Sequence, residues 1–294
     1  MKLHTLHRTR YAYAAPVRES FNEARLRPAT HDGQECRHFD LRVSPDARTS
    51  HYFDFYDNCV HLFEIAAPHG ELVVEATALV FTRDTPALPP DAAPAPLARV
   101  DECLLQDRCY DFLPDSTFVE TTPDTAALAA TAIAGAGATD VWQAAQAIMR
   151  HIHAEFRYVP ASTTVHTHMR DVLRARHGVC QDFAHVMIGC CRALKIPARY
   201  VSGYLYNGPR GQLRGAQASH AWVEVYVAGA GWCGLDPTNA TLAASRHVKV
   251  AVGRDYADVS PLKGTYRGTD KRAMTVEVLV TETDEALHAE PLTR

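Results

Sequence analysis

Several features are missing from this chain of 294 residues, and each absence argues against a class of protein. No basic run stands out and the formal net charge is −4, so nothing indicates binding to nucleic acid or to an anionic membrane. No apolar stretch is long enough to span a bilayer, and the first residues lack the apolar segment of a signal peptide. We therefore expect a cytoplasmic protein with no membrane partner.

Metal-binding signatures are also scarce. None of the eight cysteines pair as C-x-x-C, which argues against a zinc ribbon or a thioredoxin-type redox site, and most are expected to be free thiols. Among the sixteen histidines, His166, His168 and His177 lack a zinc-type spacing with cysteine or carboxylate, and no acidic loop resembles a calcium site. We expect no metal and no cofactor.

Patterning divides the chain into two regions. Residues 1–83 contain alternating apolar and polar positions and β-branched runs, which predict a small antiparallel domain that resembles a β-sandwich. The segment DTPALPPDAAPAP, residues 84–96, is too rich in proline for a helix or a central strand. We therefore predict a linker and connector over residues 84–124.

The second region, residues 125–282, is predicted to be an α+β core, with a polar tail at 283–294. Apolar residues at helical spacing predict one helix over 141–156 and another over 180–194. Four strands are predicted, at Ala198–Leu205, His220–Val227, Gly231–Leu235 and Met274–Val280.

Three residues of this core suit a cysteine nucleophile with its base and the group that orients the base. Cys180 lies in HGVCQDFAH at the predicted start of a helix, where unpaired backbone N–H groups and the helix dipole favour a thiolate. His220 begins the strand HAWVEV, and Asp236 ends a second short strand in GWCGLDPTN. This combination lets a thiol attack a carbonyl carbon near neutral pH.

The same segments resemble the transglutaminase-like superfamily, through GVCQDFAH, SHAWVEVY and DPTN. The first region resembles the N-terminal region of bacterial members, through Tyr11-Ala12-Tyr13, Gln34 and Asp57-Asn58. The resemblance implies a papain-like core in which a cysteine-bearing helix packs on an antiparallel sheet. It also implies that Cys180 is the nucleophile, His220 the general acid and base, and Asp236 the residue that orients His220.

Other residues near these motifs have open roles. Gln181 and Trp222 are candidates for a second donor to the oxyanion, and Tyr204 is a candidate lining residue of the cleft. Asp182 and His185 belong to the motif, but we interpret both as structural residues, with Asp182 capping the helix.

The motifs leave three functions open. All the enzymatic ones begin with a thioester on Cys180, formed from an amide of a protein or peptide substrate. Hydrolysis of the peptidase or amidase type comes first, since the bacterial members are thought to be largely of that kind. Transfer to an amine, as in a transglutaminase, comes second. A non-catalytic protein-binding module comes third, and the N-terminal β domain is a candidate partner surface.

Overall fold

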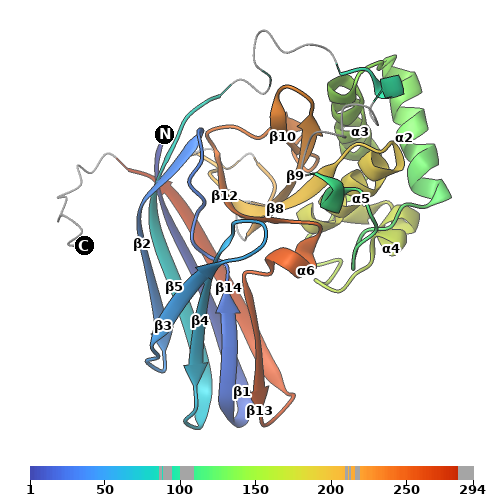
Figure 1. Ribbon diagram of the computed structural model, residues 1–294. Coiled ribbons are helices and arrows are strands. Elements are labelled where there is room, and N and C mark those ends of the chain that lie inside the picture. Colours follow the sequence, from blue (N-terminus) through green and yellow to red (C-terminus); the bar gives the residue numbers. More distant parts are fainter. Residues whose placement is uncertain are drawn as a thin grey trace.

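The structure is a computed structural model that describes residues 1–85, 88, 95–99, 109–208, 211, 213–215 and 219–283. Figure 1 shows two parts, a set of long strands and a core in which helices gather on one side of a second sheet. The long strands extend away from the helical side of the molecule. This mixed architecture confirms the predicted α+β fold class.

The first part is a seven-stranded sheet, ordered β2-β5-β1-β4-β3, with β13 and β14 also paired to β1. Its strands are β1 (Lys2–Ala24), β2 (Gln34–Ser44), β3 (Thr49–Phe53), β4 (Cys59–Ile65), β5 (His69–Thr82), β13 (Leu262–Arg267) and β14 (Arg272–Glu282). The first half of β1 pairs with β5 and β14, and its last residues pair with β4 and β13. The strand β1 therefore belongs to both halves of this sheet, the half with β2, β5 and β14 and the half with β3, β4 and β13. Together the two halves enclose an apolar cluster that includes Leu26, Phe63 and Leu72.

The position of the last strand differs from the sequence prediction. The strand expected at 274–280 lies within β14, but it pairs with Leu3–Tyr13 of β1 and not with the strands of the core. The range 125–282 therefore contains strands of both sheets. Alternation of apolar residues predicts that a strand exists, but it does not identify the strand's partner, and here the partner lies about the whole chain length away. The predicted polar tail lies outside the described residues except for Thr283.

The predicted linker is described only in part. Residues 95–99 and 109–124 are described, and they contain the short helices Leu97–Arg99 and Tyr110–Phe112. The rest of the Pro/Ala-rich segment, apart from residues 84, 85 and 88, lies outside the described residues.

The core is built on an antiparallel five-stranded sheet, ordered β11-β10-β9-β8-β12. Its strands are β8 (Ala198–Leu205), β9 (His220–Val227), β10 (Gly231–Asp236), β11 (Thr241–Leu242) and β12 (His247–Gly253). The helices are α2 (Pro123–Ala136), α3 (Val141–Glu155), α4 (Met169–Ala175), α5 (Cys180–Ala193) and α6 (Tyr256–Val259), and a small sheet joins β6 (Arg157–Tyr158) to β7 (His177–Gly178). Fully buried α5 residues such as Phe183 pack in one cluster with Val223 and Val225 of β9, so the sheet positions the helix.

Two further observations concern the described part of the chain. None of its helices is long and apolar enough to cross a membrane. No disulfide joins the seven cysteines that fall within the described ranges.

Two amide side chains tie the first sheet to the core. β12 is an edge strand of the core sheet, and its outer backbone groups need partners. Gln34 accepts from the Lys249 N–H and donates to the Lys249 carbonyl, each at 2.8 Å. Asn58 does the same for Val252, at 2.7 and 2.8 Å. The N-terminal region therefore holds β12 in the way a neighbouring strand would.

Replacing Asn58 with alanine is expected to lower the free energy of unfolding by about 2–4 kcal/mol, because it leaves a buried N–H and a buried carbonyl of Val252 unpaired. Urea denaturation followed by circular dichroism measures this change. The control is Gln146→Ala, which removes a half-buried amide of α3 whose hydrogen bond with Arg150 is exposed to solvent, and it should change stability by less than about 0.5 kcal/mol. Equal stability of the two variants would contradict the role given to Asn58.

Candidate active site

Cys180 is the first residue of α5, and its side chain is buried but for 8% of its surface. Val179 before it has an extended backbone, with φ −114° and ψ −175°, so the chain enters the helix sharply at the cysteine. The first N–H groups of a helix have no partner within the helix. They form an N-terminus with partial positive charge beside the sulfur, where a thiolate or an oxyanion is stabilised.

Asp182 fixes the entry to this helix. Its Oδ2 accepts from the Val179 backbone N–H at 2.7 Å and from the Thr163 hydroxyl at 2.6 Å. The carboxylate therefore acts as the helix cap, in agreement with its predicted structural role. Gly178 lies so close that a Cβ there would be 2.6 Å from Asp182 Oδ2.

A Gly178→Ala substitution should displace the Asp182 carboxylate and thereby move Cys180. We expect turnover to fall by about tenfold or more and the free energy of unfolding to fall by about 1–3 kcal/mol. The matched control is Gly135→Ala within α2, where a Cβ would meet nothing within 4 Å and should stabilise the helix by about 0.5–1 kcal/mol. Thermal denaturation and thiol-dependent turnover, measured on both variants, test this pair.

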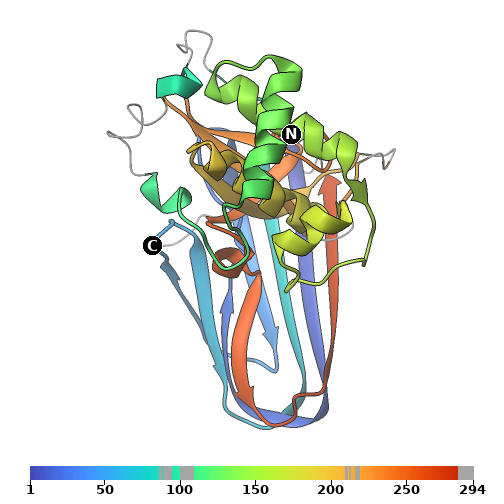
Figure 2. The ribbon, with the colours of Figure 1, turned by 90° about the vertical axis from the view of Figure 1, so that its right-hand side faces the viewer.

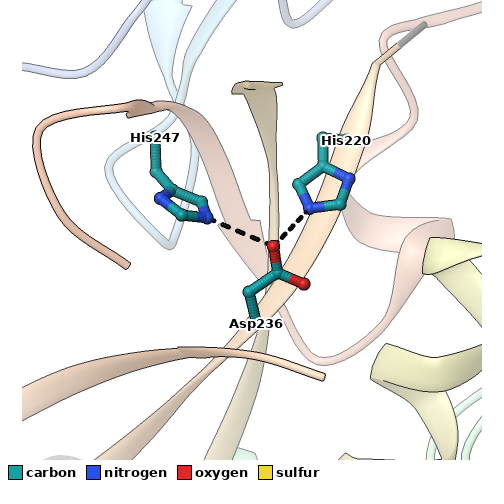
Figure 3. A group of neighbouring side chains, drawn as sticks. All are labelled: His220, Asp236 and His247. Atoms are coloured by element: carbon teal, nitrogen blue, oxygen red, sulfur yellow. Dashed lines mark hydrogen bonds and ion pairs between the residues drawn. The ribbon is translucent and has the colours of Figure 1, made fainter. Parts of the chain in front are cut away.

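His220 and Asp236 meet at adjacent strand ends, as the sequence predicts. Nε2 of His220, the first residue of β9, lies 2.8 Å from Oδ2 of Asp236, the last residue of β10 (Figure 3). Both side chains are fully buried. The other ring nitrogen, Nδ1 of His220, is buried and has no hydrogen-bond partner among the described residues. This nitrogen is the one left for the proton of a thiol.

Asp236 is held by more donors than the triad requires. Its Oδ1 accepts from the backbone N–H groups of Thr238 at 2.9 Å and Asn239 at 3.2 Å. The Asn239 amide donates to Oδ2 at 2.8 Å. These bonds orient the carboxylate, so the His220 ring has one preferred position.

A second histidine, which the sequence motifs do not reveal, also contacts Asp236. His247 Nε2 lies 3.3 Å from Asp236 Oδ2, on the side opposite His220 (Figure 3). Its Nδ1 accepts from the Ala244 N–H at 3.3 Å, so Nε2 carries the proton and donates to the carboxylate. His247 is the first residue of β12, a strand that was not predicted. The sequence signal that could have found it is the alternating apolar pattern of HVKVAVG, which His247 begins.

The charges of this group follow from burial and contact. Burial lowers the pKa of His220, but Asp236 and then the Cys180 sulfur outweigh burial and raise it well above its usual value. Burial raises the pKa of Asp236, but His220 and His247 outweigh that effect and hold it well below its usual value. Burial lowers the pKa of His247, which Asp236 only partly offsets. The site therefore favours a charged His220–Asp236 pair beside a neutral His247.

The other predicted site residues lie in different surroundings. Gln181 follows Cys180, and its amide donates to the Val165 carbonyl at 3.2 Å. Trp222 is 1% exposed and packs with Val201 in a cluster separate from that of α5. Its ring centroid is 6.1 Å from that of His220 and 5.2 Å from that of His247. These contacts suit shielding of the triad from water. The indole N–H of Trp222 is buried and has no hydrogen-bond partner among the described residues, and the oxyanion role of Trp222 stays a prediction.

Two further residues of the motifs are parts of the core. Tyr204 is 2% exposed and contacts the ring of His7 from β1, so it packs between the two parts and does not line a cleft. His185 is fully buried and accepts from the Tyr256 N–H at 3.2 Å. Burial lowers the pKa of His185 to about 3, so it is neutral and structural, as predicted.

The group His220, Asp236 and His247 also has the composition of a metal site. Its three ligand atoms lie within 4.8 Å of one another, a spacing found in no other such group of the described residues. The hydrogen bonds from both rings to one carboxylate oxygen explain this closeness without an ion. The expectation of no metal stays a prediction.

Known proteins share both parts of this chain. Residues 127–237 match the family model of the transglutaminase-like superfamily, and residues 3–80 match that of the bacterial transglutaminase-like N-terminal region. An uncharacterized protein of Mycobacterium leprae is 34% identical over 95% of this chain and 98% of its own length. One of Mycobacterium tuberculosis is 34% identical, over 96% of this chain and 94% of its own length.

A solved structure has the same fold. It is a Cytophaga hutchinsonii protein, proposed to be a cysteine protease, with a TM-score of 0.70 and 24% identity over 97% of this chain and 92% of that one. The sequence relatives extend over nearly the whole chain, and the matched core model contains Cys180, His220 and Asp236. This chain belongs to the transglutaminase-like superfamily and carries the N-terminal region of its bacterial members.

Proposed function

We propose that this protein is a cysteine-dependent hydrolase that cleaves an amide bond in a protein or peptide through a thioester on Cys180. The observation that carries the proposal is the two-sided environment of His220. Nε2 binds Asp236 at 2.8 Å, whereas Nδ1 is buried without a partner among the described residues beside the cysteine that raises the ring's pKa. This is the arrangement of a nucleophile, its base and the orienting group of the base.

In the first step the Cys180 sulfur attacks the carbonyl carbon of the substrate amide, while His220 Nδ1 holds the thiol proton. The oxygen that becomes negative faces the N-terminus of α5, where free N–H groups donate to it. His220 then gives its proton to the leaving nitrogen as the carbon–nitrogen bond breaks. A thioester on Cys180 and a free amine result.

In the second step water resolves the thioester. Neutral His220 accepts a proton from water, which attacks the thioester carbonyl, and the carboxylic acid leaves as the sulfur is released. Asp236 remains ionised throughout, because its many donors stabilise the charge. Hydrolysis needs only water as the acceptor, whereas amine transfer also needs an amine site that excludes water.

The test is intact-mass spectrometry of a glutamine-rich protein incubated with the enzyme, with and without a small primary amine. A mixed peptide library, analysed for new termini, extends the test to peptide bonds. New termini or deamidated glutamine, independent of the amine, are the expected result. The control is the Cys180→Ala variant under the same conditions.

Two results would overturn the proposal. Incorporation of the amine in place of water would identify a transglutaminase. Identical spectra for the wild type and the Cys180→Ala variant would indicate a binding protein, most of all if a thiol-reactive probe failed to label Cys180.

A further inference from the structure

A groove opens between the first sheet and the catalytic core, with a volume of about 440 Å³. Its walls come from β1, β13 and β14 on one side, and from α6, the loop residues Val165 and His166, and Ser219 on the other. In Figure 2, β13 and β14 stand apart on the face toward the viewer, below the helices. The volume is in the range of sites that hold a small ligand or a few residues of a peptide.

The groove adjoins the candidate active site. Ser219 lines it, and Ser219 directly precedes His220. Val165 lines it as well, and the carbonyl of Val165 accepts from Gln181, the residue after Cys180. A chain lying in the groove would therefore have one end beside the nucleophile.

Its surface combines aromatic rings with positive charge. The tyrosines are Tyr11, Tyr13, Tyr256 and Tyr266, and the apolar residues Met274 and Val276 extend the same surface. The Arg272 guanidinium lies 5.0 Å from the ring centre of Tyr11 and 5.6 Å from that of Tyr266. Lys263 also borders the groove, but it lies opposite Glu23 in the β1–β13 register and lines a second hollow with Glu23 and Glu64, so Arg272 is the main cation of the groove.

The guanidinium of Arg272 has no carboxylate to neutralise it. None of the described residues that line the groove is acidic, and no ion pair within the described ranges involves Arg272. An arginine stacked on rings keeps its N–H fork directed outward, ready for a carboxylate. The groove is thus complementary in charge to an acidic ligand.

Strand edges favour an extended ligand. In the described residues β13 and β14 each pair on one side only, with β1, and both line the groove. Their outer edges present backbone N–H and carbonyl groups that an extended peptide can pair with.

We propose that this groove binds an extended segment of the substrate polypeptide that carries acidic side chains next to apolar or aromatic ones. The inference rests on the proposed function, since it assigns the groove to the same substrate. A carboxylate of the segment pairs with Arg272, its apolar side chains contact the tyrosine rings, and its reacting amide reaches Cys180 past Ser219. The first sheet, including its late strands β13 and β14, thereby selects the substrate.

The test measures binding separately from catalysis. Fluorescence anisotropy of labelled octapeptides with the full-length Cys180→Ala protein compares alternating glutamate and phenylalanine with the same peptide containing serine or lysine in place of glutamate. We expect the acidic peptide to bind at least about tenfold more tightly than either, with the difference falling as salt is added. Arg272→Glu and the milder Arg272→Gln should each remove most of that difference.

The matched control is Arg267→Glu, at the end of β13, where the arginine is largely exposed, pairs with Glu19 and does not line the groove. It should leave the affinity unchanged. Equal affinity for all three peptides, or an equal loss in the Arg267 and Arg272 variants, would overturn the inference. Wild-type turnover separates the two proposals: binding without cleavage refutes the hydrolase alone, and cleavage without charge preference refutes the groove alone.

Discussion

Replacing Cys180 with alanine is expected to reduce turnover by about 10⁴-fold or more. The rate that remains is the one that substrate binding alone provides over the uncatalysed reaction. Three other cysteines of the core cannot substitute for it. Burial raises the pKa of Cys190 well above its usual value, that of Cys191 to about 12 and that of Cys233 to about 11, so these thiols remain protonated at neutral pH. The fold should persist, because the substitution removes only one sulfur atom at the first residue of α5, and the change in stability should be below about 1 kcal/mol.

The measurement is a progress curve on the substrate found by mass spectrometry, together with intact-mass analysis after brief iodoacetamide treatment at neutral pH. A single adduct on Cys180 is expected in the wild type, and none in the variant over the same time. The matched control is Cys190→Ala in the same helix, which should keep activity and lose some stability through a small cavity. Full turnover by the Cys180 variant would exclude a thioester at this residue.

The parts of the site that the sequence predicts are those encoded locally. Cys180 begins α5, His220 begins β9 and Asp236 ends β10, so each position follows from a capping pattern or a strand boundary. Local patterns also predict β8 and β9 with their observed bounds. A short stretch of chain contains all the information that such elements need.

What the sequence does not predict depends on contacts between distant segments. The pairing of β14 with β1 joins the two ends of the described chain, and alternation is equally consistent with several partners. His247 reaches Asp236 only because β12 is the edge strand next to β8. The groove likewise exists only when β13 and β14 return to the first sheet. The charges and aromatic rings of the residues that line the groove can be interpreted only after that pairing is known.

Replacing Asp236 with asparagine is expected to lower turnover by about 10⁴-fold and to move the alkaline limit of activity to lower pH. In the wild type Asp236 is the main cause that raises the pKa of His220 against burial. Because the pKa of His220 is higher in the folded protein than its unfolded value near 6.5, protonation of the ring stabilises the fold. This stabilisation is complete at pH values below 6.5 and is lost as the pH rises through the higher folded pKa.

Asparagine keeps the shape of the side chain but removes its charge, so burial then lowers the pKa of His220 and the imidazolium is lost at lower pH. The ring proton can also move to Nδ1, the wrong nitrogen. Nδ1 then carries a hydrogen and cannot accept the proton of the thiol. A profile of kcat/KM from acid to alkaline pH measures both effects. The control is Asp40→Asn, which removes an exposed carboxylate paired with Arg42 on β2 and should leave the profile unchanged. An unshifted alkaline limb in the Asp236 variant would contradict the charged His220–Asp236 pair, because removing a negative charge so close to the ring must lower the pKa of His220.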